Sequence, residues 1–196
     1  MTTPVMSAVV ALENVAKNYG DREVFSHFSV ALAPGEVLGV TGPNGSGKTT
    51  LARLLLGLET ADAGVARRAD GARFAAVFQE DRLCMHMSAV ANVRLVVGRH
   101  GGAEQGLRAV GIADDDLHRP VRELSGGQRR RVAIARALAA RADFVVFDEP
   151  LTGIDVDSQA RLIEHIRERL GNAAALVITH EPAALALASR SLTLPA

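Results

Sequence analysis

Short apolar runs alternate with longer amphipathic segments along this chain of 196 residues. Residues 9–15 and 24–32 are rich in β-forming residues and are separated by a turn at residues 19–21, so we expect two strands of a small antiparallel layer. Residues 36–41 form a compact apolar strand. Residues 144–147 are apolar throughout, which is typical of a strand buried in a parallel sheet. Further short strands are predicted at residues 73–78, 174–179 and 191–194.

Helical patterns lie between these strands. Residues 51–58 repeat leucine at helical spacing, and residues 156–170 are amphipathic. Ser125 is placed to cap a long helix with one apolar face. Residues 82–140, approximately, carry weaker helical patterns, and we expect them to form a helical subdomain inserted in the core. The alternation predicts a single α/β domain over residues 1–196, with a mostly parallel sheet flanked by helices.

The charge balance argues against nucleic acid as a partner. Lysine plus arginine and aspartate plus glutamate both number 22, so the net charge is zero, whereas nucleic-acid binders usually carry a basic excess. Aromatic residues make up 4% of the chain and tryptophan is absent, so stacking platforms for single strands are not expected either.

The sequence favours a cytosolic protein. Cys84 is the single cysteine, which excludes an internal disulfide and suits a reducing compartment. Residues 1–12 lack the positively charged start of a signal peptide. No apolar run approaches the ~18 residues that a membrane-spanning helix needs. We therefore expect any role at a membrane to depend on a partner.

A glycine-rich segment joins the strand at 36–41 to the helix at 51–58. It matches the phosphate-loop pattern G-x-x-x-x-G-K-[ST], in which glycines let backbone N–H groups converge on phosphate oxygens. Lys48 can reach the β- and γ-phosphates, Thr49 can ligate Mg²⁺, and Thr50 lies at a helix N-terminus that favours an anion. The strand–loop–helix order favours a nucleoside triphosphate site over a simple turn. The segment consists of Gly42, Pro43, Asn44, Gly45, Ser46, Gly47, Lys48 and Thr49.

Two carboxylates follow the buried strand at 144–147. Asp148 is suited to hold Mg²⁺, directly or through water, as the equivalent carboxylate of phosphate-loop enzymes does. Glu149 could polarise an attacking water. Without a phosphate loop nearby, the simpler interpretation of the two carboxylates would be the start of a solvated turn before Pro150. Beside a phosphate loop, we interpret them as catalytic.

A second short motif decides the family. It consists of Leu124, Ser125, Gly126, Gly127 and Gln128. This segment resembles the signature of the ATP-binding cassette (ABC) family, and the whole chain resembles the nucleotide-binding subunit of an ABC transporter over residues 9–194. The resemblance implies a phosphate-loop fold of ABC type and an ATPase that uses ATP and Mg²⁺.

The resemblance also implies a head-to-tail dimer. Two ATP molecules would lie between the phosphate loop of one cassette and residues 125–128 of the other, in a homodimer or a heterodimer. Asp155 matches the segment that couples the two sites across such a dimer. The neighbouring residues Arg129, Arg130 and Arg131 are interpreted as a solvated helix face.

Three further residues match family positions around the nucleotide. Gln79 would sense the γ-phosphate and Mg²⁺, and His180 would contact the γ-phosphate and support the attacking water. Tyr19 would stack on adenine. Each has a simpler reading: a polar turn residue for Gln79, a structural histidine for His180, and packing for Tyr19. Their order along the chain favours the functional reading.

Residues 77–83 look most like cassettes that serve nitrate, sulfonate and taurine importers. Residues 84–87 depart from that group, and Met85 and Met87 among them would form either an adaptable docking surface or part of the core. The leading hypothesis is the energy-coupling subunit of a small-solute importer, peripheral on the cytoplasmic face of the membrane.

That hypothesis makes transmembrane permease subunits the direct partners, with a substrate-binding protein involved indirectly. A soluble ABC ATPase in cofactor assembly, or in another role outside transport, is the alternative. Because the chain ends shortly after His180, the resemblance implies no C-terminal regulatory domain.

Overall fold

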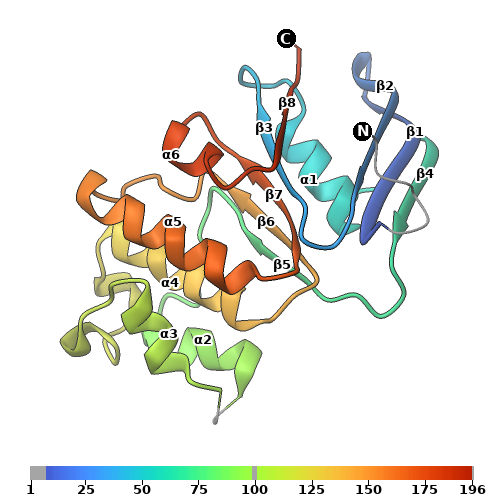
Figure 1. Ribbon diagram of the computed structural model, residues 1–196. Coiled ribbons are helices and arrows are strands. Elements are labelled where there is room, and N and C mark those ends of the chain that lie inside the picture. The colour runs from blue at the N-terminus through green and yellow to red at the C-terminus, as the bar shows by residue number, and fades with distance from the viewer. Residues whose placement is uncertain (1–7, 99–100, 196) are drawn as a thin grey trace.

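The structure is a computed structural model that describes residues 8–98 and 101–195. Its centre is a five-stranded sheet in the order β5-β6-β7-β3-β8, and every neighbouring pair in it is parallel (Figure 1). The predicted parallel core is therefore confirmed. The strands are β3 (Val37–Thr41), β5 (Phe74–Val77), β6 (Phe144–Asp148), β7 (Ala174–Ile178) and β8 (Arg190–Thr193).

A second, antiparallel sheet lies beside the first and contains three strands in the order β2-β1-β4. Strands β1 (Val10–Tyr19) and β2 (Arg22–Leu32) are the two that the sequence predicts. Strand β4 (Ala63–Arg68) was not predicted. It is an edge strand with mostly exposed side chains, so it carries no alternation of apolar and polar residues that a sequence could show.

The two faces of the parallel sheet are covered by different helices. On β6 and β7, alternate side chains belong to separate cores, since successive side chains of a strand point to opposite faces. Phe144 and Leu176 pack with α1 (Lys48–Leu56) and the antiparallel sheet. Phe147 and Val177 pack with α4 (Gly126–Ala139) and α5 (Val156–Leu170). Because both faces of β6 are buried in a core, residues 144–147 are apolar throughout.

Between β5 and α4, the regular elements that the structure describes are helical and are joined by loops. They are α2 (Ala89–Val97), α3 (Ala103–Ala109) and two 3₁₀ turns, η2 (Asp114–Asp116) and η3 (Val121–Glu123). Helices α2 and α3 contact each other and α4, below the sheet in Figure 1. A short helix, α6 (Pro182–Leu185), follows β7. None of the helices in the described ranges is long and apolar enough to cross a membrane.

Arg130 corrects the prediction of a solvated arginine face on α4. Its side chain is buried, at 4% exposure, and donates to the carbonyl oxygens of Phe78 at 2.5 Å and Gln79 at 2.7 Å. Its Nη1 also lies 3.2 Å from Oδ1 of Asp81, although this charge contact lacks hydrogen-bond geometry. Three consecutive helical positions span more than half a turn. One of them must therefore face inward on a helix packed on both sides.

We predict that Arg130→Met destabilises the protein. The substitution keeps the length of the side chain but leaves two carbonyl groups and the Asp81 carboxylate without their cation, which costs roughly 3 kcal/mol when a buried pair is broken. Urea denaturation would measure the change. Arg161→Met is the matched control because Arg161 is exposed and has no ion pair in the described part of the chain. Equal denaturation midpoints for the two variants would contradict the prediction.

Candidate functional site

The predicted nucleotide residues converge at the carboxyl edge of the parallel sheet. They surround a cavity of about 460 Å³. The phosphate loop and the start of α1 form one wall, and Tyr19 at the end of β1 lies beside them. The opposite part of the cavity is formed at the ends of β5, β6 and β7 by Gln79, Asp148, Glu149 and His180; Asp148 is the last residue of β6 and the other three follow their strands. Five segments far apart in sequence thus meet at one site.

The loop conformation depends on its glycines. Gly47 is the N-cap of α1 with φ of 96°, in the left-handed region that glycine adopts without strain. A Cβ at Gly47 would lie 2.6 Å from Cγ1 of Val24, so a side chain would also collide with β2. Lys48 folds back over the loop and donates to the carbonyl oxygens of Gly42 at 2.6 Å and Pro43 at 2.8 Å.

Several features of the loop fit a bound phosphate chain. The first-turn N–H groups of α1 open toward the loop, and a helix N-terminus favours an anion. The Lys48 ammonium contacts only carbonyl oxygens and has no ion pair in the described chain. The hydroxyl of Ser46 is buried, and no described group forms a hydrogen bond with it. These groups have unused capacity to bind an anion.

Asp148 and Glu149 present two carboxylates next to the loop. Asp148 is buried at the end of β6, and burial raises its pKa, with a smaller contribution from the neighbouring charge of Glu149. A divalent cation at this position would offset both effects. Among the described residues no cluster of three or more His, Cys, Asp or Glu could hold a metal ion. That fits Mg²⁺, which usually takes one or two protein carboxylates and completes its shell with phosphates and water.

Glu149 is held in an unusual conformation. Its φ is 50°, in the left-handed region that non-glycine residues rarely adopt. Its backbone N–H donates to the carbonyl oxygen of Ile178 at 2.8 Å, and its Oε2 accepts a hydrogen bond from the Thr179 hydroxyl at 3.1 Å. Its Oε1 lies 3.8 Å from Nε2 of His180. Strained backbone of this kind is typical of functional sites.

Tyr19 offers an open aromatic face at the rim of the cavity. Its side chain is 45% exposed, which is high for an aromatic residue of this size. The Lys17 ammonium lies 5.2 Å from the ring centroid and forms an ion pair with Glu59 at 3.0 Å. The tyrosine is therefore positioned from β1 with one face available for a planar ligand.

The second predicted segment lies outside this cavity. Ser125 and Gln128 form a capping box at the start of α4, in which each side chain binds the backbone N–H of the other. Gln128 also donates to Asp116 at 2.6 Å. A Cβ at Gly127 would lie 2.4 Å from the carbonyl oxygen of Gly153, so this glycine is required for packing as well.

Asp155 likewise serves a local structural role. It caps α5 by accepting a hydrogen bond from the Ser158 N–H at 2.9 Å, and it pairs with Arg131 at 2.8 Å. The bond from Ser158 lowers the pKa of Asp155. Residues 125–128 and Asp155 are thus neighbours of each other, and one chain does not bring them to its own phosphate loop.

Sequence reasoning missed three residues of the site. Arg22 and Val24, on β2, line the cavity, and Arg22 donates to the carbonyl oxygen of Gly45 at 2.5 Å. Thr179 bonds to Glu149 as described above. Arg22 lies just after Tyr19 and Thr179 just before His180, so adjacency to predicted residues was the only signal in the sequence.

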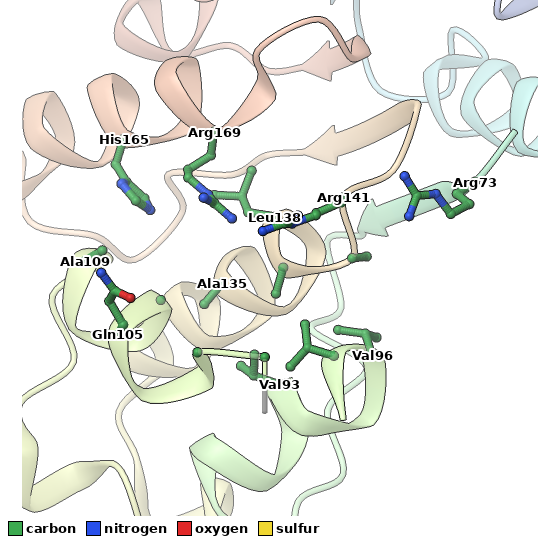
Figure 2. A pocket seen from close by; sticks show the side chains of 16 residues that line it. Arg73, Val93, Val96, Gln105, Ala109, Ala135, Leu138, Arg141, His165 and Arg169 are labelled. Carbon is green, nitrogen blue, oxygen red and sulfur yellow. The ribbon is translucent and has the colours of Figure 1, made fainter. Parts of the chain in front are cut away.

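A different hollow, of about 470 Å³, opens at the opposite edge of the sheet. Figure 2 shows His165 and Arg169 of α5 on one side of it and Val93 and Val96 of α2 on the other. Arg141, which precedes β6, also lines it. Burial lowers the pKa of His165, and the nearby Arg169 adds to the effect. No residue that the sequence analysis singled out lines this hollow.

Comparisons with known proteins identify the family of the chain. A model of the ABC transporter family matches residues 25–152. The zinc import ATP-binding protein ZnuC of Yersinia enterocolitica is 36% identical over 187 residues, which cover 90% of this chain and 71% of ZnuC.

Two solved structures of the cassette MJ0796 share the fold. The dimeric structure of this bacterial ABC transporter cassette superposes with a TM-score of 0.84 at 24% identity, over 95% of this chain and 94% of that one. A dimeric post-hydrolysis state of MJ0796 bound to ADP and phosphate gives the same TM-score and identity over 94% of each chain. The likeness confirms the predicted cassette fold.

We predict that Lys48→Ala weakens nucleotide binding. Losing a hydrogen bond to a charged phosphate costs about 1.5–3 kcal/mol, so the dissociation constant for ATP should rise about tenfold to a hundredfold. Isothermal titration calorimetry would measure it, with Arg161→Ala as a control that removes a cation outside the cavity. Wild-type affinity in Lys48→Ala would exclude Lys48 from phosphate binding.

Proposed function

The chain belongs to the ABC transporter family and is an ATPase of that family, and we propose that it hydrolyses ATP at the phosphate-loop cavity to drive a transporter. The observation that carries the proposal is the meeting of the loop, two carboxylates and a histidine at one sheet edge. Each group supplies something that phosphoryl transfer to water requires.

Charge neutralisation would come from the loop side of the cavity. Lys48 would exchange its loop carbonyls for the β- and γ-phosphate oxygens, while loop N–H groups bind the remaining oxygens. Thr49 and Asp148 would hold Mg²⁺, with Gln79 beside them, and the bound ion would supply further positive charge to the phosphates. The raised pKa of Asp148 supports a cation at this position.

The attacking water would be bound and deprotonated on the side of the cavity opposite the phosphate loop. Glu149 would accept a proton from that water, and His180, 3.8 Å from Glu149, would contact the γ-phosphate and steady the water. Tyr19 would stack on adenine from the rim. These roles follow the family resemblance and the positions of the side chains in the cavity.

We propose that a second cassette completes the site. Residues 125–128 and Asp155 lie away from the cavity of their own chain, which supports their use by a partner cassette in a head-to-tail dimer. Ser125, Gly126 and Gly127 would then present helix N–H groups to the γ-phosphate across the interface. MJ0796 is dimeric in both solved structures, and closure on ATP would bring two such cassettes together.

Transport would require permease subunits, since no helix in the described part of the chain could cross a membrane. ZnuC is named for zinc import, whereas the sequence of residues 77–83 led us to expect a nitrate, sulfonate or taurine importer. The ZnuC relative supports an importer role, and the cassette would be peripheral on the cytoplasmic face of the membrane. We propose the importer role and treat the solute as a property of the permease and its binding protein.

A catalytic test separates hydrolysis from binding. In Glu149→Gln, ATP binding should persist and turnover should fall about 10²–10⁴-fold, the usual contribution of a general base. The measurements are phosphate release and ATP affinity, with Glu164→Gln as a control because Glu164 is exposed on α5. Unchanged hydrolysis in Glu149→Gln would remove Glu149 from this role.

A partner test separates transport from the soluble alternative. Because Glu149→Gln should hold ATP without hydrolysing it, the variant is expected to retain its partners during affinity purification with ATP and Mg²⁺. A multi-span membrane protein recovered from the membrane fraction would support transport, and its type would indicate the solute. Recovery of soluble partners alone, with the chain absent from membranes, would favour the role in cofactor assembly.

A further inference from the structure

The hydroxyl of Thr179 makes two hydrogen bonds that fix its orientation. Thr179 is fully buried directly after β7. Its Oγ1 accepts a hydrogen bond from the Glu181 N–H at 3.0 Å and donates to Oε2 of Glu149 at 3.1 Å. A threonine hydroxyl has a single proton. With Glu181 occupying a lone pair, that proton is directed to Glu149.

Glu149, which accepts that proton, is also bonded to β7 through its backbone. The Glu149 N–H donates to the carbonyl oxygen of Ile178, the residue just before Thr179. Two consecutive residues therefore fix Glu149, one through its main chain and one through its carboxylate. Such double anchoring suits a residue kept at a positive φ of 50°.

The two carboxylate oxygens of Glu149 have different surroundings. Oε2 is bound by Thr179, while Oε1 lies on the side of His180, 3.8 Å from Nε2. We propose that Thr179 is a positioning residue for hydrolysis, which holds Oε2 so that Oε1 faces the attacking water beside His180. The proposal rests on the role of Glu149 as general base given above.

A second layer of contacts supports the threonine. The side chain of Glu181 accepts a hydrogen bond from Nε2 of Gln159 at 3.2 Å, and the same nitrogen donates to the carbonyl oxygen of Ile154. Gln159 lies on α5, so Glu181 is tied to a helix rather than to a free loop. The N–H that orients the Thr179 hydroxyl is therefore fixed by the core.

Thr179→Val tests the proposal because valine has nearly the same shape and lacks the hydroxyl. We expect kcat for ATP to fall about tenfold to a hundredfold, the scale of a misplaced catalytic group, with KM within about twofold of wild type. Thr179→Ser, which keeps the hydroxyl, should restore kcat to within about threefold. Thr60→Val is the matched control, since it removes an exposed hydroxyl in the loop after α1, outside the residues that line the cavity.

Melting temperature and ATP affinity, measured for every variant, show whether the fold is intact. Wild-type kcat in Thr179→Val, or a Thr179→Ser variant as slow as the valine variant, would overturn the positioning role. If Thr179→Val fails to fold, Thr179→Ala takes its place. The proposal then expects a low kcat for Thr179→Ala and a kcat near wild type for Thr179→Ser, and equal values for these two variants would overturn it.

A double mutant distinguishes this inference from the proposed function. When Glu149→Gln has already removed the base, adding Thr179→Val should lower the residual rate no further, since the two residues act through one carboxylate. Additive losses would overturn the coupling. Normal hydrolysis in Glu149→Gln would instead refute the proposed base, whereas a slow Glu149→Gln with a normal Thr179→Val would remove only the role of the threonine.

Discussion

The register of three parallel strands determines where the site forms. Ile178 of β7 pairs with Val40 of β3 on one side and with Asp148 of β6 on the other, so these residues lie in one row across the sheet. The phosphate loop begins two residues after Val40, and Glu149 and Thr179 follow the same row by one residue. A slip of one residue would send each strand's side chains to the opposite face and separate these groups.

Placing two carboxylates in this row destabilises the folded protein when no ligand is bound. Burial raises the pKa of Asp148 above its unfolded value, so the unfavourable term is absent below the unfolded pKa, grows as pH rises from there, and is complete above the folded pKa. Glu149 adds backbone strain. Binding a cation and a phosphate chain would relieve the charge term, which links ligand affinity to stability. The geometry that suits the ligand therefore lowers the stability of the protein without ligand.

How much the sequence predicts depends on whether a feature is local. The phosphate loop, the capping residue Ser125 and the buried strand β6 depend on neighbouring residues, and the structure confirms these elements. Arg130 and Thr179 have partners that are about 50 and 30 residues away along the chain, so their sequence surroundings did not indicate their roles. The wrong prediction for Arg130 followed from judging a charged run without knowing what packs on α4.

Helix α4 connects two segments for which we propose different partners. At its start, Gly127 packs against Gly153, and Arg131 pairs with Asp155. One residue away, Arg130 binds the carbonyl oxygens of Phe78 and Gln79, in the segment that leads from the cavity to the region expected to meet a permease. These contacts are direct, those of Arg130 are also buried, and packed elements of this kind can carry coupling between distant sites. Movement of Gln79 toward a nucleotide would therefore shift the same helix whose first residues, next to Ser125, we propose to face a second cassette.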